Sequence, residues 1–313
     1  MTKFKVGSLF TGIGGIDIGF EHAGFEISWA NDNDFYAGKT YSYNFPHIHL
    51  IQKDIRDVNP QTLPDIDILT AGFPCQPFSV MGYQQGFKDP RGNLFFEIAR
   101  FVDQKKPKVV LLENVKNLAF HDNSKTFSVI CKTLTELGYF FKYKIINATE
   151  MNIPQDRSRI FIVAFSDKDM CDAFSFPDSV ALTKTINDII DRTSKQKDFY
   201  YYTSKDKHYF ELNKKIQNQI GIYRIDDSGI AMKKYEICPT LKANMGTYPD
   251  RIPIVRDNFG IRKLTLEECL AFQGFPSEFH FNTISLTSAY KQCGNTVCVP
   301  VVESIARKIR NVL

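Results

Sequence analysis

FKVGSLFTGIGGIDIGFEHAG, residues 4–24, predicts a β-strand, a glycine-rich turn and a helix in direct succession. The strand covers residues 4–10 and the turn covers residues 11–15, after which apolar side chains recur at helical spacing until Gly24 ends the helix. These apolar residues are Ile16, Phe20 and Ala23. A strand followed at once by a helix is the repeating unit of a parallel α/β sheet, so this stretch predicts the fold class.

The same alternation continues through the first half of the chain. Further strands are predicted at residues 25–29, 48–51, 66–71, 108–112, 139–146 and 159–165. Asn93 is predicted to cap a helix whose apolar stripe comprises Leu94, Phe95, Ile98, Phe101 and Val102, and a second helix is predicted over residues 127–137. The pattern therefore predicts a parallel sheet with interleaved helices.

The pattern loosens after about Ser179, where strands become short and tyrosine, lysine and proline become frequent. Helices return at residues 265–272 and from Pro300 to the C-terminus, where Val302, Ile305 and Ile309 share one face. We therefore expect a discontinuous first domain, residues 1–180 with 286–313, and a smaller, irregular second domain over residues 181–285.

Composition describes an ordinary globular protein of 313 residues, 43% of them hydrophobic, with a modest formal charge of +4. Neither a signal peptide nor a membrane-spanning stretch is recognisable, so we expect a cytoplasmic protein. Seven cysteines without C-x-x-C spacing support neither a disulfide framework nor a metal site. Free thiols that behave as small buried hydrophobes are expected at Cys131, Cys171, Cys269 and Cys298.

A cofactor site is predicted at the carboxyl ends of the strands, where open α/β sheets bind their ligands. Asp32 follows the second strand about 20 residues beyond Gly12, the spacing at which a carboxylate meets a ribose hydroxyl. Gly12-x-Gly14 is followed by Asp17 where the dinucleotide fingerprint has its third glycine. A nucleoside cofactor without a pyrophosphate, such as S-adenosylmethionine, fits this pattern better than a dinucleotide; an ordinary tight turn is the alternative.

Cys75 stands directly after the strand at residues 66–71, in a loop restrained by Pro74 and Pro77. Loops on a rigid scaffold are where catalytic groups concentrate. A thiol needs a cationic or hydrogen-bonding neighbourhood to act as a nucleophile at neutral pH, and Arg157 and Arg159 are candidates to supply it. Glu113, at the end of the next strand, is a candidate general acid.

Five segments resemble, in order and approximate spacing, the motifs of the cytosine-C5 DNA methyltransferases. They are Phe10-Thr11-Gly12-Ile13-Gly14-Gly15, Gly72-Phe73-Pro74-Cys75-Gln76-Pro77-Phe78-Ser79, Glu113-Asn114-Val115, Gln155-x-Arg157-x-Arg159 and Gly294-Asn295-Thr296-Val297. The resemblance extends over nearly the whole chain and is closest to the compact bacterial restriction-modification enzymes. It implies a Rossmann-like, S-adenosylmethionine-dependent methyltransferase sheet with helices on both faces.

The resemblance also implies the chemistry. Cys75 thiolate would add to C6 of cytosine, which makes C5 nucleophilic enough to accept the methyl group. Glu113 would hydrogen-bond N3 and the exocyclic amine, Arg159 would hold O2, and Arg157 would lie near the catalytic loop.

In the cofactor pocket, the resemblance implies that Phe10 flanks the adenine, with Gly12 and Gly14 in the turn and Asp32 on the ribose. The other implied pocket residues are Asp54, Ile55, Pro74, Leu94 and Asn295. Family members often carry an aromatic residue directly after the ribose-binding acid, whereas this chain has Asn33. Stacking on the adenine is therefore not provided at that position unless Phe35 compensates.

The resemblance implies a double-stranded DNA substrate whose target cytosine is swung out of the helix, because C5 and C6 are blocked in a paired base. The loop from Gln76 to Gly92, which includes Ser79, would close over that base. Residues 181–285 would recognise the target through the Pro239-Thr240-Leu241 signature and nearby basic side chains. These basic residues are Lys242, Arg251, Arg256, Arg262 and Lys263.

Three other functions are open at this point. A tRNA cytosine-5 methyltransferase keeps the chemistry, but the Cys-Phe-Thr signature of that branch does not occur here. A catalytically inactive DNA-binding module would have no need of Cys75 beside Glu113, and a nicotinamide oxidoreductase would bind a dinucleotide. The leading prediction is a monomeric DNA methyltransferase that works alongside a cognate restriction endonuclease, without a metal ion or a membrane.

Overall fold

The computed structural model describes residues 3–74, 94–122, 124–218, 221–226, 228–232, 236–247, 250–282 and 284–313. Contacts within the chain divide it into two compact units. The first unit comprises Met1–Ile146, Ser158–Asp178 and Val301–Leu313, and the second comprises Asn147–Arg157 and Ser179–Pro300. Residues 286–300, which the sequence assigned to the first domain, belong to the second compact unit. The division into a catalytic domain and a target-recognition domain at residues 181 and 285 stays a prediction.

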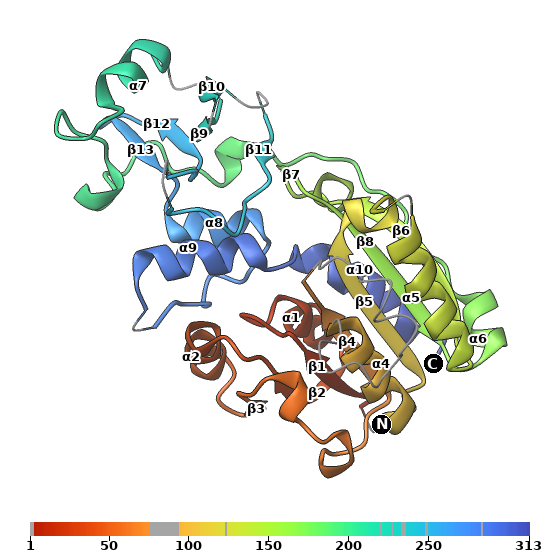
Figure 1. Cartoon of the computed structure of the whole chain (residues 1–313). Helices are drawn as coiled ribbons and strands as arrows, with labels where there is room; N and C mark the ends of the chain where they lie inside the picture. Colours follow the sequence, from red (N-terminus) through yellow and green to blue (C-terminus); the bar gives the residue numbers. More distant parts are fainter. Residues whose placement is uncertain are drawn as a thin grey trace. The chain divides into compact units, whose positions relative to one another are not determined.

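The first unit contains a seven-stranded sheet of order β3-β2-β1-β4-β5-β8-β6 (Figure 1). Its strands are β1 (Lys5–Leu9), β2 (Glu26–Asn31), β3 (His49–Ile51), β4 (Ile68–Gly72), β5 (Val109–Val115), β6 (Phe140–Asn147) and β8 (Ser158–Phe165). β1 pairs in parallel with both β2 and β4, and β2–β3 and β4–β5 are parallel as well. The predicted α/β class and all seven predicted strands are confirmed.

The fully parallel sheet is not confirmed, because β8 runs antiparallel to β5. Only residues 148–157 connect β6 to β8, and they form the 3₁₀ helix η5 (Ala148–Met151) and the short strand β7 (Gln155–Asp156). A parallel crossover requires a dozen or more residues, usually with an α-helix, whereas a short connection suffices for antiparallel neighbours. Connection length therefore explains the reversal.

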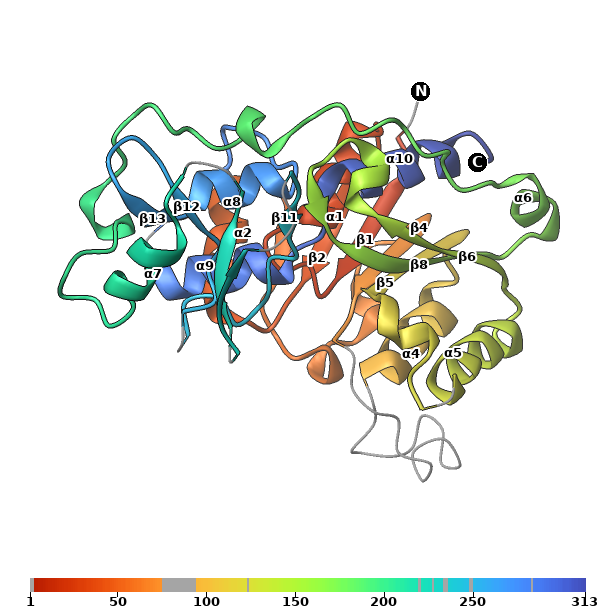
Figure 2. The same cartoon turned by 90° about the horizontal axis from the view of Figure 1, so that it is seen from above.

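Helices cover both faces of this sheet, with α4 and α5 on one face and α1 and α10 on the other (Figure 2). The helices of the first unit are α1 (Gly15–His22), α2 (Phe35–Asn44), α4 (Leu94–Lys105), α5 (Lys125–Glu136), α6 (Lys168–Ala173), most of α10 (Val299–Arg310), and the 3₁₀ helices η1 (Ile55–Asp57), η2 (Pro60–Thr62) and η4 (Lys116–Ala119). Val302, Ile305 and Ile309 of α10 are completely buried, as their shared face predicts.

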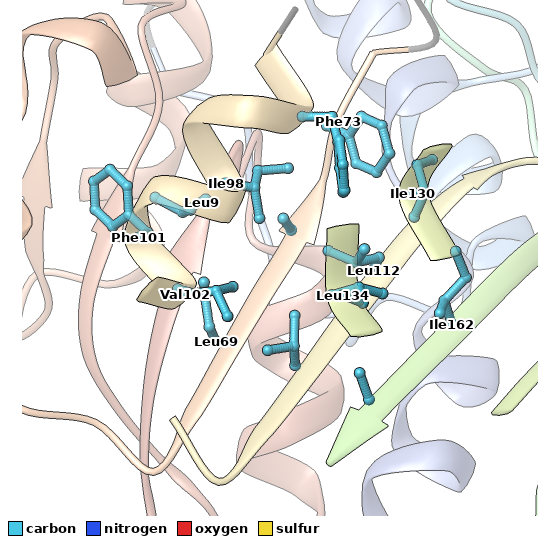
Figure 3. Close-up of a cluster of buried hydrophobic side chains, with 14 of the residues drawn as sticks. Leu9, Leu69, Phe73, Ile98, Phe101, Val102, Leu112, Ile130, Leu134 and Ile162 are labelled. Atoms are coloured by element: carbon cyan, nitrogen blue, oxygen red, sulfur yellow. The ribbon is translucent and has the colours of Figure 1, made fainter. Parts of the chain in front are cut away.

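The main core lies between the sheet and helices α4 and α5 (Figure 3). Ile98, Phe101 and Val102 of α4 are all buried in this core, and the Phe101 ring centroid lies 6.1 Å from that of Trp29 in β2, so the predicted apolar stripe is confirmed. Asn93, its predicted cap, lies outside the described residues. Because this core fixes β4 and β5 against α4, it also fixes the strand ends that precede the candidate site.

Four α-helices of the described residues were not predicted from the apolar pattern: α2 and α6 in the first unit, and α7 (Tyr209–Lys215) and α9 (Leu286–Asn295) in the second. Of these, α2, α6 and α9 begin at a capping side chain. Asp34 accepts hydrogen bonds from the backbone N–H groups of Tyr36 and Ala37, and Ser285 accepts one from Ser288. For α2, the capping residue Asp34 was the sequence signal that could have indicated the helix, because its apolar face is weak.

The second unit contains a four-stranded antiparallel sheet of order β10-β9-β12-β13 and a two-stranded parallel pair, β11-β7. Its remaining elements are β9 (Tyr223–Asp226), β10 (Gly229–Met232), β11 (Cys238–Pro239), β12 (Ile254–Arg256), β13 (Ile261–Lys263), α7 (Tyr209–Lys215), α8 (Leu266–Phe272), α9, η6 (Ile186–Asp188) and η7 (Asp198–Tyr200). A small core of isoleucine, leucine and tyrosine side chains joins α7 to this sheet. The predicted helix at residues 265–272 is confirmed as α8.

Arg262, interpreted from the sequence as a DNA contact, is completely buried in the second unit. Its Nε donates to Asp257 Oδ2 at 2.7 Å, and its two terminal nitrogens donate to both carboxylate oxygens of Glu268. Glu268 also closes the capping box of α8 with Thr265. The sequence interpretation is therefore wrong for this residue, because its charge is neutralised by two carboxylates inside the fold.

Across the described residues, no helix is both long enough and apolar enough to cross a membrane.

Arg262→Met should lower the free energy of unfolding by about 3–5 kcal/mol, because it leaves two buried carboxylates without their cation. Arg307→Met is the matched control, since Arg307 is exposed and its two contacts, an (i, i+4) pair with Glu303 and a hydrogen bond to the carbonyl of His22, are exposed as well, so a loss of about 1 kcal/mol or less is expected. Urea unfolding of both variants measures the difference, and equal losses would contradict the buried network.

Candidate active site

One row of backbone partners crosses five strands and sets the position of the site. The registers place Leu9 beside Asn31 and Ala71, Asn31 beside Ile51, and Ala71 beside Leu112. On four of these strands the residues that follow the row are Phe10, Asp32, Gly72 and Glu113, all predicted or motif residues; on β3 the following residue is Gln52. Since the strands are parallel, their carboxyl ends bring these residues to one edge of the sheet.

The glycine turn and Asp32 are joined directly. Gly12 N–H donates to Asp32 Oδ2 at 2.8 Å, and Asp34 N–H donates to Asp32 Oδ1 at 2.8 Å. Gly12 has a φ of +57°, and a Cβ built on it would meet no atom of the described residues within 4 Å. The turn therefore presents open backbone next to a carboxylate, which suits close approach of a ligand.

Gly14 is a glycine for a different reason. Its φ is +87°, and a Cβ there would lie 2.4 Å from the ring of Phe45 and 3.1 Å from that of Tyr41. Both rings belong to or directly follow α2, and they stack with centroids 4.6 Å apart. The predicted cofactor-binding residue Gly14 thus makes room for α2, while Gly12 makes room for a ligand.

The third strand end carries Asp54 and Ile55. Asn31 Nδ2 donates to the carbonyls of Ile51 and Lys53, which fixes the chain just before Asp54. Ile55 is buried in the main core. Phe10, half-buried with a φ of +54°, packs against the same core.

Asp54 forms a two-pronged ion pair with Arg56, with Arg56 Nε 2.8 Å from Oδ1 and Nη2 2.6 Å from Oδ2. These hydrogen bonds lower the pKa of Asp54 to about 2, so the carboxylate is ionised at neutral pH. Arg100 of α4 donates to the carbonyls of Ile55 and Val58 at 2.8 and 3.0 Å. The Asp54 turn is therefore held by the helix that begins at Leu94.

Glu113 and Arg159 are paired at the end of β5. Arg159 Nε lies 3.2 Å from Glu113 Oε1, with 16% and 10% of the respective side chains exposed. The β5–β8 register places Val115 opposite Arg159, so Glu113 is the diagonal neighbour of Arg159 on the same face. A carboxyl group beside a guanidinium, with limited solvent, can bind a ring that offers both donors and acceptors.

Asn114 fixes the base of the cysteine loop, because its Nδ2 donates to the carbonyl of Phe73 at 2.8 Å. Phe73 packs against Phe95 of α4, with ring centroids 6.0 Å apart. Pro74 is exposed and Leu94 is half-buried. The predicted residues Cys75, Gln76 and Ser79 lie outside the described residues.

Arg157 was predicted to be catalytic, whereas its side chain in the structure is buried and contacts main-chain carbonyls. It is 2% exposed, and its terminal nitrogens donate to the main-chain carbonyls of Leu241, Gly294 and Thr296. Each of these partners belongs to the second unit, as does Arg157 itself. The guanidinium therefore holds main-chain segments together, and we interpret Arg157 as a structural residue.

The predicted DNA-binding residues of the second unit have mixed surroundings. Leu241 is completely buried, so its side chain contributes packing in this structure and not a surface. The Thr240 hydroxyl donates to the carbonyl of Asp156, across the β11–β7 pair. Arg251 is half-buried with a φ of +52°. Asn295, predicted for the cofactor pocket, is the exposed last residue of α9.

The described thiols are protonated or buried. Burial raises the pKa of the half-buried Cys131 thiol to about 11, and it also raises the pKa values of the buried Cys238 and Cys269 thiols. Cys171, Cys269 and Cys298 are buried, as predicted for small hydrophobic residues. Among the residues that the structure describes, His, Cys, Asp and Glu side chains do not gather into a group that could hold a metal ion.

Several supporting residues were missed by sequence reasoning. Arg56, Arg100 and Asn114 act through hydrogen bonds to neighbours rather than through a recognisable motif. Phe35, considered as a compensating aromatic residue, is 57% exposed and lies under the ammonium group of Lys39, 4.7 Å from its ring centroid. Of these residues, only Asn114 stands inside a motif that the sequence brought to notice.

The family model for the C-5 cytosine-specific DNA methylase matches residues 4–311. The Type II methyltransferase M.Bsp6I of Bacillus sp. (strain RFL6) is 46% identical over 309 residues, which cover 97% of this chain and 98% of that protein. The Type II methyltransferase M.NgoBI of Neisseria gonorrhoeae is 39% identical over 312 residues, covering 99% and 94% respectively.

Among solved structures, the chain is similar to a DNMT2 triple mutant from Spodoptera frugiperda, with a TM-score of 0.76 and 20% sequence identity. The match covers 98% of this chain and 100% of that chain. At this identity the likeness bears on the fold alone, and it supports the predicted Rossmann-like α/β arrangement.

Gly14→Ala should lower the free energy of unfolding by about 2–5 kcal/mol, because it combines a left-handed φ with overpacking against Phe45. Gly12→Ala has the left-handed φ without the clash, so a loss of about 1–2 kcal/mol is expected. Urea unfolding compares the two variants. If both lose the same stability, the contact between Gly14 and α2 has no energetic role.

Proposed function

The chain belongs to the family of C-5 cytosine-specific DNA methylases, and we propose that it methylates C5 of a cytosine swung out of a specific double-stranded DNA sequence. It is a DNA cytosine-5 methyltransferase, and its family and fold are those of S-adenosylmethionine-dependent methyltransferases. The proposal concerns the steps and residues by which this chain performs that reaction.

The observation that carries the proposal is the Glu113–Arg159 pair at the end of β5. Gly72 of β4 is the register partner of Glu113, and Cys75 follows Gly72 by three residues. The chain thus brings a carboxyl group and a guanidinium to the strand end that leads into the cysteine loop. These are the groups needed to hold a cytosine ring by its edge while a thiolate attacks it.

Cys75 is proposed as the nucleophile. Its thiolate forms a bond to C6, the electron pair of the C5–C6 double bond moves to a new C4–C5 double bond, and the C4–N3 pair moves to N3, so that C5 acquires enamine-like nucleophilic character. C5 then takes the methyl group as the bond from methyl to the sulfonium sulfur breaks and leaves a thioether. The proton on C5 leaves to a base, and the electron pair of that C–H bond re-forms the C5–C6 double bond and expels Cys75 as thiolate, while N3 gives back any proton that it took. The product is 5-methylcytosine, and the thiol group returns unchanged.

Glu113 and Arg159 are proposed to stabilise the charge that develops during the attack. Glu113 would hydrogen-bond N3 and the exocyclic amine, and would protonate or polarise N3 as negative charge accumulates in the ring. Arg159 would donate to O2, and its pairing with Glu113 at 3.2 Å already orients both groups. Preorganised donors of this kind stabilise a transition state without reorganisation.

The described residues of the first unit fit S-adenosylmethionine. Gly12 offers open backbone beside Asp32, a carboxylate of the kind that accepts hydrogen bonds from ribose hydroxyls. Asp54 would accept from the adenine amine, with Ile55, Phe10, Pro74 and Leu94 as apolar neighbours, and the family resemblance adds Asn295 to the residues proposed for cofactor binding. The bound cofactor supplies a methyl group made electrophilic by its sulfonium.

The target cytosine is proposed to leave the duplex, because C5 and C6 lie inside the base stack. Gln76 and Ser79 of the cysteine loop, with Thr240 and Arg251 of the second unit, are proposed to contact the DNA. The buried Leu241 and Arg157 are proposed to support these contacts from within the fold. The second unit would then determine which DNA sequence is recognised and which cytosine in it is modified.

A protective role in a restriction-modification system is proposed from the relatives, which are named Type II methyltransferases. In such a system a monomeric enzyme would mark the sites that a cognate endonuclease cuts. Bisulfite sequencing of DNA from cells that express the protein would identify the modified cytosine and its flanking bases.

Cys75→Ala should abolish methyl transfer to duplex DNA and the covalent adduct with an oligonucleotide that carries 5-fluorocytosine in the target sequence, because no thiolate can reach C6. Cys131→Ala is the matched control, since Cys131 lies half-buried on α5 with a raised pKa. Labelled S-adenosylmethionine with duplex DNA or tRNA, followed by denaturing electrophoresis, measures both activities. Transfer to tRNA instead of DNA, or an adduct that survives in Cys75→Ala, would overturn the assignment.

Glu113→Gln should lower kcat about a hundredfold or more at saturating DNA and cofactor, since an amide cannot transfer a proton to N3. Glu136→Gln on α5 removes an exposed carboxyl group that pairs only with Lys132, and it should leave kcat unchanged. Steady-state kinetics on duplex DNA compares them. A Glu113→Gln enzyme that keeps its kcat would show that the carboxyl group takes no part in the chemistry.

A further inference from the structure

Asp17 occupies the position at which a dinucleotide-binding turn has its third glycine, and the proposed chemistry makes no use of it. It lies in the first turn of α1 and is completely buried. Burying a carboxyl group costs free energy unless hydrogen bonds compensate. Its retention beneath the glycine turn therefore calls for a physical reason.

The partners of Asp17 come from two different segments. Thr11 Oγ1 of the glycine turn donates to Asp17 Oδ2, and Tyr41 Oη of α2 donates to the same oxygen at 2.7 Å. Tyr41 is also completely buried. One carboxylate oxygen thus connects the turn after β1 with the helix after β2.

These contacts belong to a closed circuit that runs through hydrogen bonds, the Thr11–Gly12 backbone and helix α2. Gly12 N–H, next to Thr11, donates to Asp32, and Asp34 N–H donates to the other oxygen of Asp32. Asp34 in turn caps α2, the helix that carries Tyr41 back to Asp17. The position of Asp32 relative to the glycine turn is therefore fixed by its own hydrogen bonds to Gly12 and Asp34. It is also fixed by Asp17, which joins Thr11 of the turn to α2.

Packing at Gly14 supports the same connection. The rings of Tyr41 and Phe45 approach Gly14 so closely that no side chain fits there. Movement of α2 would shift Tyr41 and, through the shared oxygen of Asp17, also Thr11. The turn and α2 are thus expected to move together or not at all.

We propose that Asp17 is a positioning residue for cofactor binding, which holds the Gly12 turn and Asp32 in the arrangement that receives the nucleoside of S-adenosylmethionine. The inference rests on the proposed cofactor site, but it assigns a role to a residue that does not touch the cofactor. A preorganised site loses less conformational freedom on binding, so the effect falls on affinity rather than on the chemical step.

The electrostatic surroundings agree with a carboxyl group retained for its hydrogen bonds. Burial raises the pKa of Asp17, and the neighbouring hydroxyl groups of Ser8, Thr11 and Tyr41 oppose that rise. The N-terminal turn of α1 also favours a negative charge at this position. The hydroxyl groups and the helix end therefore offset part of the cost of burying this carboxyl group.

The experiment compares Thr11→Val with Thr11→Ser, and both with Asp17→Asn, in the full-length chain. Isothermal titration gives the Kd for S-adenosylmethionine, and steady-state kinetics gives its KM and kcat on duplex DNA. Thr11→Val should raise Kd and KM roughly tenfold, the effect of one lost charge-assisted hydrogen bond, with kcat within about twofold of the parent. Thr11→Ser keeps the donor and should restore the parent affinity.

Asp17→Asn should raise Kd in the same direction, and Thr11→Val combined with Asp17→Asn should cost less than the sum of the two, because both changes remove the same bond. Glu136→Gln, which changes an exposed carboxyl group on α5 away from this network, is the control and should bind normally. If Asp17→Asn does not fold, the Thr11 pair still decides the question.

Folded variants that all bind with the parent Kd would overturn the inference, as would losses that appear in kcat and stability but not in affinity. A parent enzyme that methylates DNA yet shows this null result leaves the proposed function standing. A parent chain that does not bind S-adenosylmethionine at all overturns the proposed function, and the role of Asp17 with it.

Discussion

The register of the parallel strands is the constraint on which the site depends. One row of neighbours crosses β3, β2, β1, β4 and β5, so the residues that follow it meet at one edge whatever their separation in the sequence. Asp32 and Glu113 are 81 positions apart in the chain, yet both stand one residue beyond that row. A shift of one residue in any strand would turn its functional side chain toward the opposite face. The buried apolar faces against α4 and α5 exclude such a shift.

Around this edge, the groups proposed to touch substrate and cofactor are held by others that do not. Asp17 accepts a hydrogen bond from Thr11 of the glycine turn. Arg100 donates to the carbonyl of Ile55 next to Asp54, and Asn114 donates to the carbonyl of Phe73 at the start of the cysteine loop. Two of these three reach a main-chain carbonyl. Fixing backbone in this way positions the functional side chain without competing for its hydrogen bonds.

How far the sequence could predict this structure differs between its parts. The strands of the first unit and the stripe of α4 followed from apolar periodicity, because a buried sheet leaves a strong pattern. Helix α2 did not, since its signal was the single cap Asp34. In the second unit, Arg262 was misjudged because a charged residue in the sequence looks the same whether it meets solvent or two buried carboxylates. Long-range partners such as Glu268 are visible only in the fold.

Arg157 and Arg159, two residues apart, belong to one motif but serve different ends, and the partners of Arg157 have an evolutionary consequence. Its terminal nitrogens donate to main-chain carbonyls, at Leu241, Gly294 and Thr296. Every amino acid supplies a carbonyl, so substitutions at Leu241 and Thr296 leave these acceptors in place. The region proposed to read DNA could therefore diverge toward new targets while the guanidinium that holds it in shape stays the same.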